Sequence, residues 1–200
     1  MRHDIIIAGF GGQGIMLAGQ VLATAGMLEG HNVVWSPSYG PEMRGGAAHC
    51  TVIVSPDPIG SPIVSQADAA LIMDQPSLAK FEDKVRPGGL MLINSSLIRH
   101  APARDDIRVY RIPANARAEE AGDVRTANMV MLGALYALLA PVGREAISGA
   151  FRTICPANKT HLLPLNEQAL EMGITEISRK QAPSVVASRA DARSVARQSR

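Results

Sequence analysis

Residues 5–14 have the sequence IIIAGFGGQG, in which an apolar run leads directly into four closely spaced glycines. The apolar run predicts a buried strand, and the segment from Gly9 to Gly14 matches the G-x-G-x-x-G spacing of a dinucleotide-binding turn. Such a turn lets the chain pass sharply from a strand into a helix, and it aims backbone N–H groups at an anion. We therefore expect a strand, a phosphate-binding loop and a helix, in that order.

The residues after this loop support the helix but not a nicotinamide site. Apolar residues recur at helical spacing over residues 15–25, and the helix is expected to stop at Gly30. A second strand is expected at 32–35, and an NAD site requires an acidic residue at its end. The chain has Ser-Pro-Ser at 36–38, and Glu29 precedes the strand. A free-standing NAD(P)-binding oxidoreductase is thus an alternative that lacks its ribose-binding acid.

Strands and helices alternate along the rest of the chain. After a polar loop at 36–46, strands are expected at 48–54, 69–73, 90–94 and 107–112, and helices at 75–84, 114–121, 127–139, 144–153 and 164–172. This alternation predicts an α/β fold with a single Rossmann-like, doubly wound, mostly parallel sheet and helices on both faces. Asp74 is expected to cap a helix, and Asn128 to cap its helix or to hold a neighbouring loop.

Composition limits the domain organisation and the partners. Two hundred residues, of which 46% are hydrophobic, suffice for one domain. We expect this domain at 1–178 and a basic, disordered tail at 179–200, where six Lys and Arg accompany one Asp. The tail lacks aromatic residues, so no nucleic-acid partner is expected. No apolar run approaches the ~20 residues of a membrane helix and no signal peptide is evident, so we expect a cytoplasmic protein without membrane contact.

The residues that usually carry chemistry are sparse. The only cysteines, Cys50 and Cys155, are too few for a four-cysteine iron–sulfur cluster or zinc site, and the histidines lack metal-ligand spacing. His49 and Cys50 are neighbours in a predicted strand, so their side chains point to opposite faces and cannot cooperate as base and nucleophile. Asp68 and Asp74 flank a strand without forming an evident dyad. We expect no catalytic residue and no metal site.

A second group of unusual residues is the loop SYGPEMRGG at 38–46. It follows the second predicted strand, on the edge where α/β sheets bind ligands. Its glycines permit close approach to a ligand, and Arg44 is able to clamp a phosphate or carboxylate through two parallel hydrogen bonds. A rigid surface loop, in which Glu42 and Arg44 face water or each other, explains the composition equally well.

Four motifs together resemble one family: GFGGQG at 9–14, SYGPEMRGG at 38–46, VSQAD at 64–68 and NMVMLGAL at 128–135. In this order they are similar to the gamma subunit of 2-oxoacid:ferredoxin oxidoreductases, which include pyruvate, 2-oxoglutarate and ketoisovalerate enzymes. The resemblance covers roughly residues 3–175. It implies a subunit of a larger enzyme that oxidatively decarboxylates a 2-oxoacid, forms an acyl-CoA and reduces ferredoxin. Alone, the chain is not expected to be catalytically competent.

The same resemblance implies a division of labour among subunits. Thiamine diphosphate and the iron–sulfur clusters belong to partner chains, namely alpha, beta and a ferredoxin-like delta subunit. This chain contributes to assembly and to a shared coenzyme A site. In the single-chain pyruvate enzymes the matching loop carries lysines where this chain has Glu42 and Met43, so Arg44 is the remaining cation. The implied coenzyme A contacts are Gly11, Gly12, Gln13, Gly14, Tyr39, Arg44, Gly45 and Gly46.

Two questions stay open at the level of sequence. The substrate is expected to be 2-oxoglutarate, with branched-chain 2-oxoacids and pyruvate as alternatives. A related hypothesis is that the chain is a subunit of an indolepyruvate oxidoreductase. The second question is whether the two glycine-rich loops bind coenzyme A at all. In a purely structural interaction subunit, both loops would instead pack against partner chains.

Overall fold

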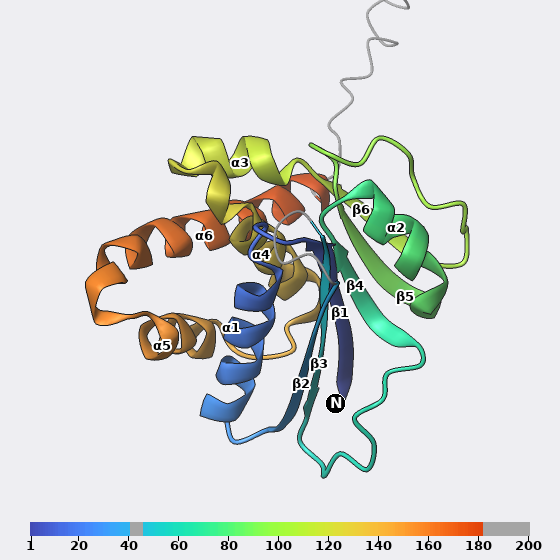
Figure 1. Cartoon of the computed structure of the whole chain (residues 1–200), viewed down its shortest axis with the longest axis horizontal. Coiled ribbons are helices and arrows are strands. Elements are labelled where there is room, and N and C mark those ends of the chain that lie inside the picture. The colour runs from blue at the N-terminus through green and yellow to red at the C-terminus, as the bar shows by residue number, and fades with distance from the viewer. Residues whose placement is uncertain (41–45, 182–200) are drawn as a thin grey trace, which may run out of the picture.

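The computed structural model describes residues 1–40 and 46–181. In this part of the chain six strands form one sheet, in the order β2-β3-β1-β4-β5-β6 (Figure 1). The strands are β1 His3–Phe10, β2 Asn32–Tyr39, β3 Ala47–Ser55, β4 Ala67–Ile72, β5 Val85–Asn94 and β6 Arg108–Ile112. β1, β4, β5 and β6 pair in parallel, and β3 is antiparallel to both β1 and β2. The predicted α/β fold with a mostly parallel sheet is confirmed, with β3 as the reversed strand.

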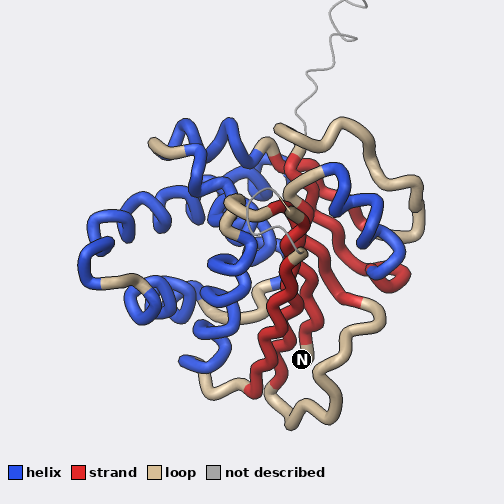
Figure 2. The backbone as a smooth tube through the Cα atoms, viewed as in Figure 1, coloured by secondary structure: helices blue, strands red, loops and turns tan. Residues whose placement is uncertain are grey.

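Helices cover both faces of the sheet, but unequally (Figures 1 and 2). The described helices are α1 Ile15–Leu28, α2 Gln75–Phe81, α3 Ala114–Ala121, α4 Ala127–Leu139, α5 Arg144–Ile154 and α6 Leu163–Gln181. Short 3₁₀ helices occupy Glu82–Lys84, Val124–Thr126 and Ala157–Leu162. α2 lies on one face, and α1, α4, α5 and α6 lie on the other with α3 at their end. No helix in the described ranges has the length and apolarity to cross a membrane.

The apolar run of β1 is continuous because both of its faces are covered. Ile5 and Ile7 belong to the larger core cluster, under α1, α4, α5 and α6. Ile6 and Ala8 belong to the smaller cluster, under α2. Successive side chains of a strand point to opposite faces, so a strand between two helix layers needs apolar residues at every position.

α4 is apolar on all sides because it is buried within the chain itself. Its residues from Ala127 to Leu135 are all buried, and α6 packs closely against it. The close approach depends on two glycines, since a Cβ at Gly133 would overlap the carbonyl oxygen of Leu170 and one at Gly173 would overlap that of Val130. α4 is therefore a core helix of this domain.

Several predicted boundaries are wrong. The polar loop expected at 36–46 is in part strand, because β2 continues to Tyr39 and pairs with β3. Pro37 is tolerated there since β2 is an edge strand, where a missing N–H breaks no ladder. The helix expected to end at residue 172 is α6, which runs to Gln181. Residues 182–200 lie outside the described part of the chain.

The extension of α6 has a visible cause. Ile177 is buried, and the half-buried Arg117 of α3 pairs with Glu176 at 2.9 Å. Lys180 contacts the same carboxylate at 3.2 Å, one helical turn further on. The pair of Arg117 and Glu176 holds the last turns of α6 against α3, and Lys180 supports it from within α6.

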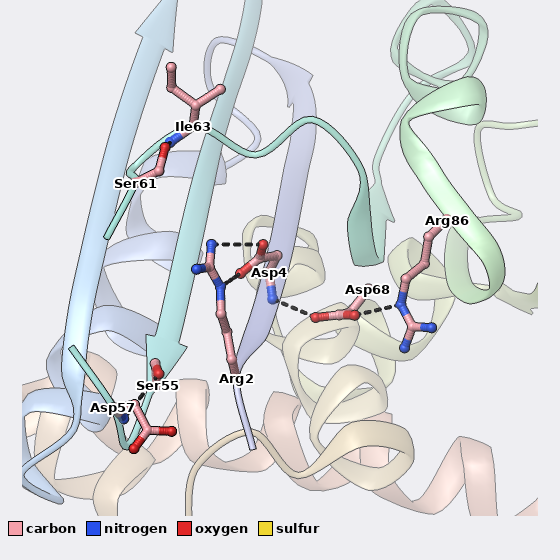
Figure 3. A network of polar contacts seen from close by, with 8 residues as sticks. All are labelled: Arg2, Asp4, Ser55, Asp57, Ser61, Ile63, Asp68 and Arg86. Atoms are coloured by element: carbon pink, nitrogen blue, oxygen red, sulfur yellow. Dashed lines mark hydrogen bonds and ion pairs between the residues drawn. The ribbon is translucent and has the colours of Figure 1, made fainter. Parts of the chain in front are cut away.

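Acidic side chains at the amino ends of β1 and β4 are committed to structural contacts (Figure 3). Asp68 accepts a hydrogen bond from the backbone N–H of Asp4 at 2.8 Å and one from Arg86 Nε at 2.6 Å. Arg2 pairs with the carboxylate of Asp4 at 2.7 Å. Asp74 lies beyond the other end of β4, roughly 20 Å away at ~3.3 Å per residue. Asp68 and Asp74 therefore do not form a dyad.

Candidate functional site

The glycine-rich loop connects β1 to α1 through a sharp turn. Gly12 has a φ of 108° and Gly14 a φ of 73°, in the left-handed region that favours glycine. At Gly9 space is the constraint, because a Cβ there would lie 2.9 Å from Cβ of Met73. The predicted sequence of strand, glycine turn and helix is confirmed.

Gln13 braces the loop from within. Its side-chain oxygen accepts a hydrogen bond from the N–H of Phe10 at 2.9 Å, and its Nε2 donates to the carbonyl oxygen of Met73 at 3.3 Å. The backbone N–H of Gln13 donates to the carbonyl oxygen of Phe10, and that of Gly11 to the carbonyl oxygen of Gly46. The N–H groups of Gly11 and Gln13 are therefore used inside the protein.

Several N–H groups that remain for a ligand belong to the start of α1. The helix begins with Gly14 as N-cap, and within the described residues no side chain caps it. The first-turn N–H groups, at residues 15–17, have no acceptor within the helix, and the first turn holds no acidic residue. They border a hollow of about 290 Å³, and its other walls are Phe10, Gly11, Gly12, Gly14, Tyr39 and Ala48. An uncapped helix N-terminus on a hollow is a favourable place for an anion.

The two glycine-rich loops meet at this hollow. The Gly11 N–H donates to the carbonyl oxygen of Gly46 at 2.9 Å, and the Gly40 N–H donates to that of Ala47 at 2.7 Å, where β2 ends and β3 begins. Tyr39 is 59% exposed and lines the hollow. The structure thus brings Tyr39 and Gly46 to the glycine turn. Arg44 and Gly45 lie outside the described residues.

Asn128, near the start of α4, stabilises the glycine-rich loop through a hydrogen bond. Its side chain is 2% exposed, and Nδ2 donates to the carbonyl oxygen of Gly14 at 2.9 Å. Of the two predicted roles, holding a neighbouring loop is confirmed. The signal was one polar residue at the start of an apolar helix. Sequence reasoning missed Phe10, which is 37% exposed and stands between the glycine hollow and two further hollows.

His49 and Cys50 lie on opposite faces of β3, as predicted. Cys50 is fully buried under α1, and burial raises the pKa of its thiol to about 12. His49 packs on the other face, with its ring 4.9 Å from that of Phe81. No group of three His, Cys, Asp or Glu residues with metal-binding geometry occurs among the residues described.

Comparison with known sequences identifies close relatives. A family model described as pyruvate ferredoxin/flavodoxin oxidoreductase matches residues 4–176. Ketoisovalerate oxidoreductase subunit VorA of Methanothermobacter thermautotrophicus is 39% identical over 84% of this chain and 35% of its own length. 2-Oxoglutarate synthase subunit KorC of Methanocaldococcus jannaschii is 37% identical over 78% of this chain and 85% of its own length. The chain therefore spans about a third of VorA but most of KorC.

Solved structures give the same result. The gamma subunit of a keto/oxoacid ferredoxin oxidoreductase from Geobacter sulfurreducens is 32% identical, with a TM-score of 0.76 over 88% of this chain and 99% of that chain. A 2-oxoglutarate:ferredoxin oxidoreductase from Magnetococcus marinus, with 2-oxoglutarate, coenzyme A and succinyl-CoA bound, shares the fold at 23% identity and a TM-score of 0.80, over 89% of this chain and 31% of that chain. The chain thus belongs to the pyruvate ferredoxin/flavodoxin oxidoreductase family and corresponds to its gamma subunit.

Proposed function

We propose that this chain is the gamma subunit of a multi-subunit 2-oxoacid:ferredoxin oxidoreductase and that it holds part of the coenzyme A site. The observation that carries the proposal is the uncapped N-terminus of α1, which opens onto the glycine hollow. The structurally similar Magnetococcus marinus enzyme contains bound coenzyme A, which supports this ligand. The site residues are Gly11, Gly12, Gln13, Gly14, Tyr39, Arg44, Gly45 and Gly46.

These residues have different roles in the proposed site. The N–H groups at the start of α1 receive the diphosphate, and Gly12 leaves room for it because no atom lies within 4 Å of a Cβ built there. Gln13 and Gly46 shape the loop through their internal hydrogen bonds, and Arg44 supplies a positive charge. The chain positions coenzyme A so that its thiol reaches the acyl group formed on a partner chain.

A glycine substitution tests this site directly. Gly12→Ala places a methyl group in the hollow and is expected to raise KM for coenzyme A by about tenfold or more in the assembled enzyme, because it displaces phosphate from the helix N-terminus. The matched control is Gly30→Ala. Gly30 also has positive φ and an open Cβ position, but it follows the other end of α1. Both variants carry ~1–2 kcal/mol of backbone strain, so only a selective effect of Gly12→Ala supports the site.

Arg44→Ala separates coenzyme A binding from a purely structural role. If Arg44 binds coenzyme A, the variant weakens coenzyme A binding and leaves the complex intact. In a purely structural interaction subunit, the variant loosens the complex without a selective effect on coenzyme A. Sedimentation of the complex together with coenzyme A titration distinguishes the two results.

We assign thiamine diphosphate and the iron–sulfur clusters to alpha, beta and delta partner chains, because this chain has two cysteines and no thiamine diphosphate motif. The proposed substrate of the complex is 2-oxoglutarate, in keeping with the similarity to KorC, although VorA is about equally similar. Ferredoxin reduction assayed with 2-oxoglutarate, 2-oxoisovalerate, pyruvate and indolepyruvate decides among the substrates. Micromolar binding of NAD(P) to the isolated chain would instead favour a free-standing oxidoreductase.

A further inference from the structure

A second hollow, which we call the His49 hollow, lies across Phe10 and Ala48 from the glycine hollow. Its volume is about 170 Å³, against roughly 30 Å³ for one water molecule. Most of its walls are apolar, and His49, Ser77 and Lys80 add polar groups to them. A mostly apolar hollow with a few convergent polar groups is the usual composition of a small-ligand site.

Two basic side chains lie against one aromatic ring in the His49 hollow. The ring of His49 lies 4.9 Å from the ring of Phe81, and Nζ of Lys80 lies 5.2 Å from the centroid of the same ring. Burial lowers the pKa of His49, and the positive charge of Lys80 lowers it further. A bound anion would offset both effects, because it favours the protonated imidazole and neutralises the ammonium group.

The carboxylate of Asp74, which also lines the His49 hollow, forms its hydrogen bond with α2. Asp74 lines the His49 hollow, and its Oδ1 accepts a hydrogen bond from the N–H of Ser77 at 2.9 Å, which caps α2. The charged groups of the described chain that border the hollow with His49 are thus Lys80 on α2 and Asp74 at the cap of α2. Among the residues that the structure describes, no carboxylate raises the pKa of His49.

We propose that the His49 hollow is an anion subsite that takes a phosphate group, with the His49 imidazolium and the Lys80 ammonium as its charged donors. The Ser77 hydroxyl is a third donor on the same wall. Because Phe10 and Ala48 line both hollows, the occupant we assign is the ribose 3′-phosphate of the coenzyme A molecule whose diphosphate sits at the start of α1. This assignment rests on the proposed function, whereas the anion subsite itself does not.

The anion subsite is tested on the isolated full-length chain with inorganic phosphate. The pKa of the His49 imidazole is followed by NMR, with its resonance assigned from its loss in His49→Gln. We expect phosphate to raise this pKa, and Lys80→Met to weaken phosphate binding by about fivefold or more. Lys84→Met is the matched control, because Lys84 is an exposed lysine on the adjoining 3₁₀ helix and not on the hollow. An unchanged His49 titration at roughly ten millimolar phosphate overturns the proposal.

The source of the phosphate is tested in the assembled enzyme with coenzyme A and 3′-dephospho-coenzyme A. We expect wild type to bind coenzyme A about tenfold more tightly than the dephosphorylated form, and the double variant His49→Gln, Lys80→Met to lose this preference. If phosphate shifts His49 but the double variant keeps the preference, the anion subsite stands and serves a separate phosphate-bearing ligand. A third result is that Gly12→Ala weakens the binding of coenzyme A and of 3′-dephospho-coenzyme A equally, while neither phosphate nor coenzyme A changes the pKa of His49. That result overturns the anion subsite and leaves the glycine hollow as the coenzyme A site.

Discussion

Cys50 illustrates at the scale of one residue how burial decides chemistry. Its Sγ donates to the carbonyl oxygen of Ile15 at 3.7 Å, under the first turn of α1. Burial raises the pKa of the thiol from its ordinary 9.0 to about 12, and the contact with Trp35 lowers it by less. Since the folded pKa is the higher one, the neutral thiol contributes its stability in full below the ordinary pKa. That contribution is lost as pH rises through the folded pKa.

We therefore expect Cys50 to resist alkylation in the folded chain. Iodoacetamide at about pH 8 attacks thiolates, and the thiolate fraction of Cys50 is very small at that pH. Cys155, which is half-buried and follows α5, is the internal control and is expected to react. Peptide mass mapping measures both sites, and in urea both should be modified. Equal rates for the two cysteines in the folded chain would contradict the assigned burial of Cys50.

At the scale of elements, the contact between α4 and α6 depends on the absence of side chains. A methyl at position 173 would overlap the carbonyl oxygen of Val130 and lie 2.8 Å from the N atom of Ala134. Backbone atoms cannot move aside as a flexible side chain can, so we expect Gly173→Ala to lower the free energy of unfolding by ~1–3 kcal/mol. Urea denaturation of the full chain measures the loss.

Gly149→Ala on α5 is the matched control for this packing prediction. The nearest atom to a methyl at position 149 is Cδ1 of Leu28, at 3.1 Å, which is the end of a flexible side chain. The substitution also removes a glycine from a helix interior, so we expect stability to stay unchanged or to rise by up to ~1 kcal/mol. A similar loss of stability for both variants would contradict the close approach of α4 and α6.

The sequence predicts the ranges of helices and strands better than it predicts which strands pair and which loops meet. Helices α3 and α4 match the predicted ranges, and α3 ends at Gly122, a glycine with positive φ. The extent of β2 was missed because Ser36, Pro37 and Ser38 are poor strand formers locally, and their pairing with β3 is a tertiary contact. The meeting of the two loops at Gly11 and Gly46 follows from the pairing of β1 with β3, which is also a tertiary contact, so only the family resemblance anticipated it. The His49 hollow combines residues of β3 and α2, and no local pattern reveals it.

At the scale of the whole molecule, exposed apolar side chains gather around Phe10 at the carboxyl end of β1. Leu17 and Tyr39 share the glycine hollow with Phe10, and Leu97 and Val124 share a neighbouring hollow with it. Apolar side chains around an exposed aromatic residue are typical of a protein interface. In the proposed function, the coenzyme A thiol must reach an acyl group on another chain, which requires this face to meet that chain.

We therefore expect Phe10→Ser to weaken assembly with the partner chains by about tenfold or more, because it removes an aromatic anchor from the centre of that face. The isolated chain should keep its fold and lose ~1–2 kcal/mol in free energy of unfolding, since Phe10 is only partly buried. The matched control is Met27→Ser, which removes a side chain that is 67% exposed near the opposite end of α1. Sedimentation of the co-expressed complex and urea denaturation of the isolated chain provide the two measurements. If both variants assemble like wild type, the partner chains do not bind at the Phe10 face, and a coenzyme A site shared across that face loses its geometric basis.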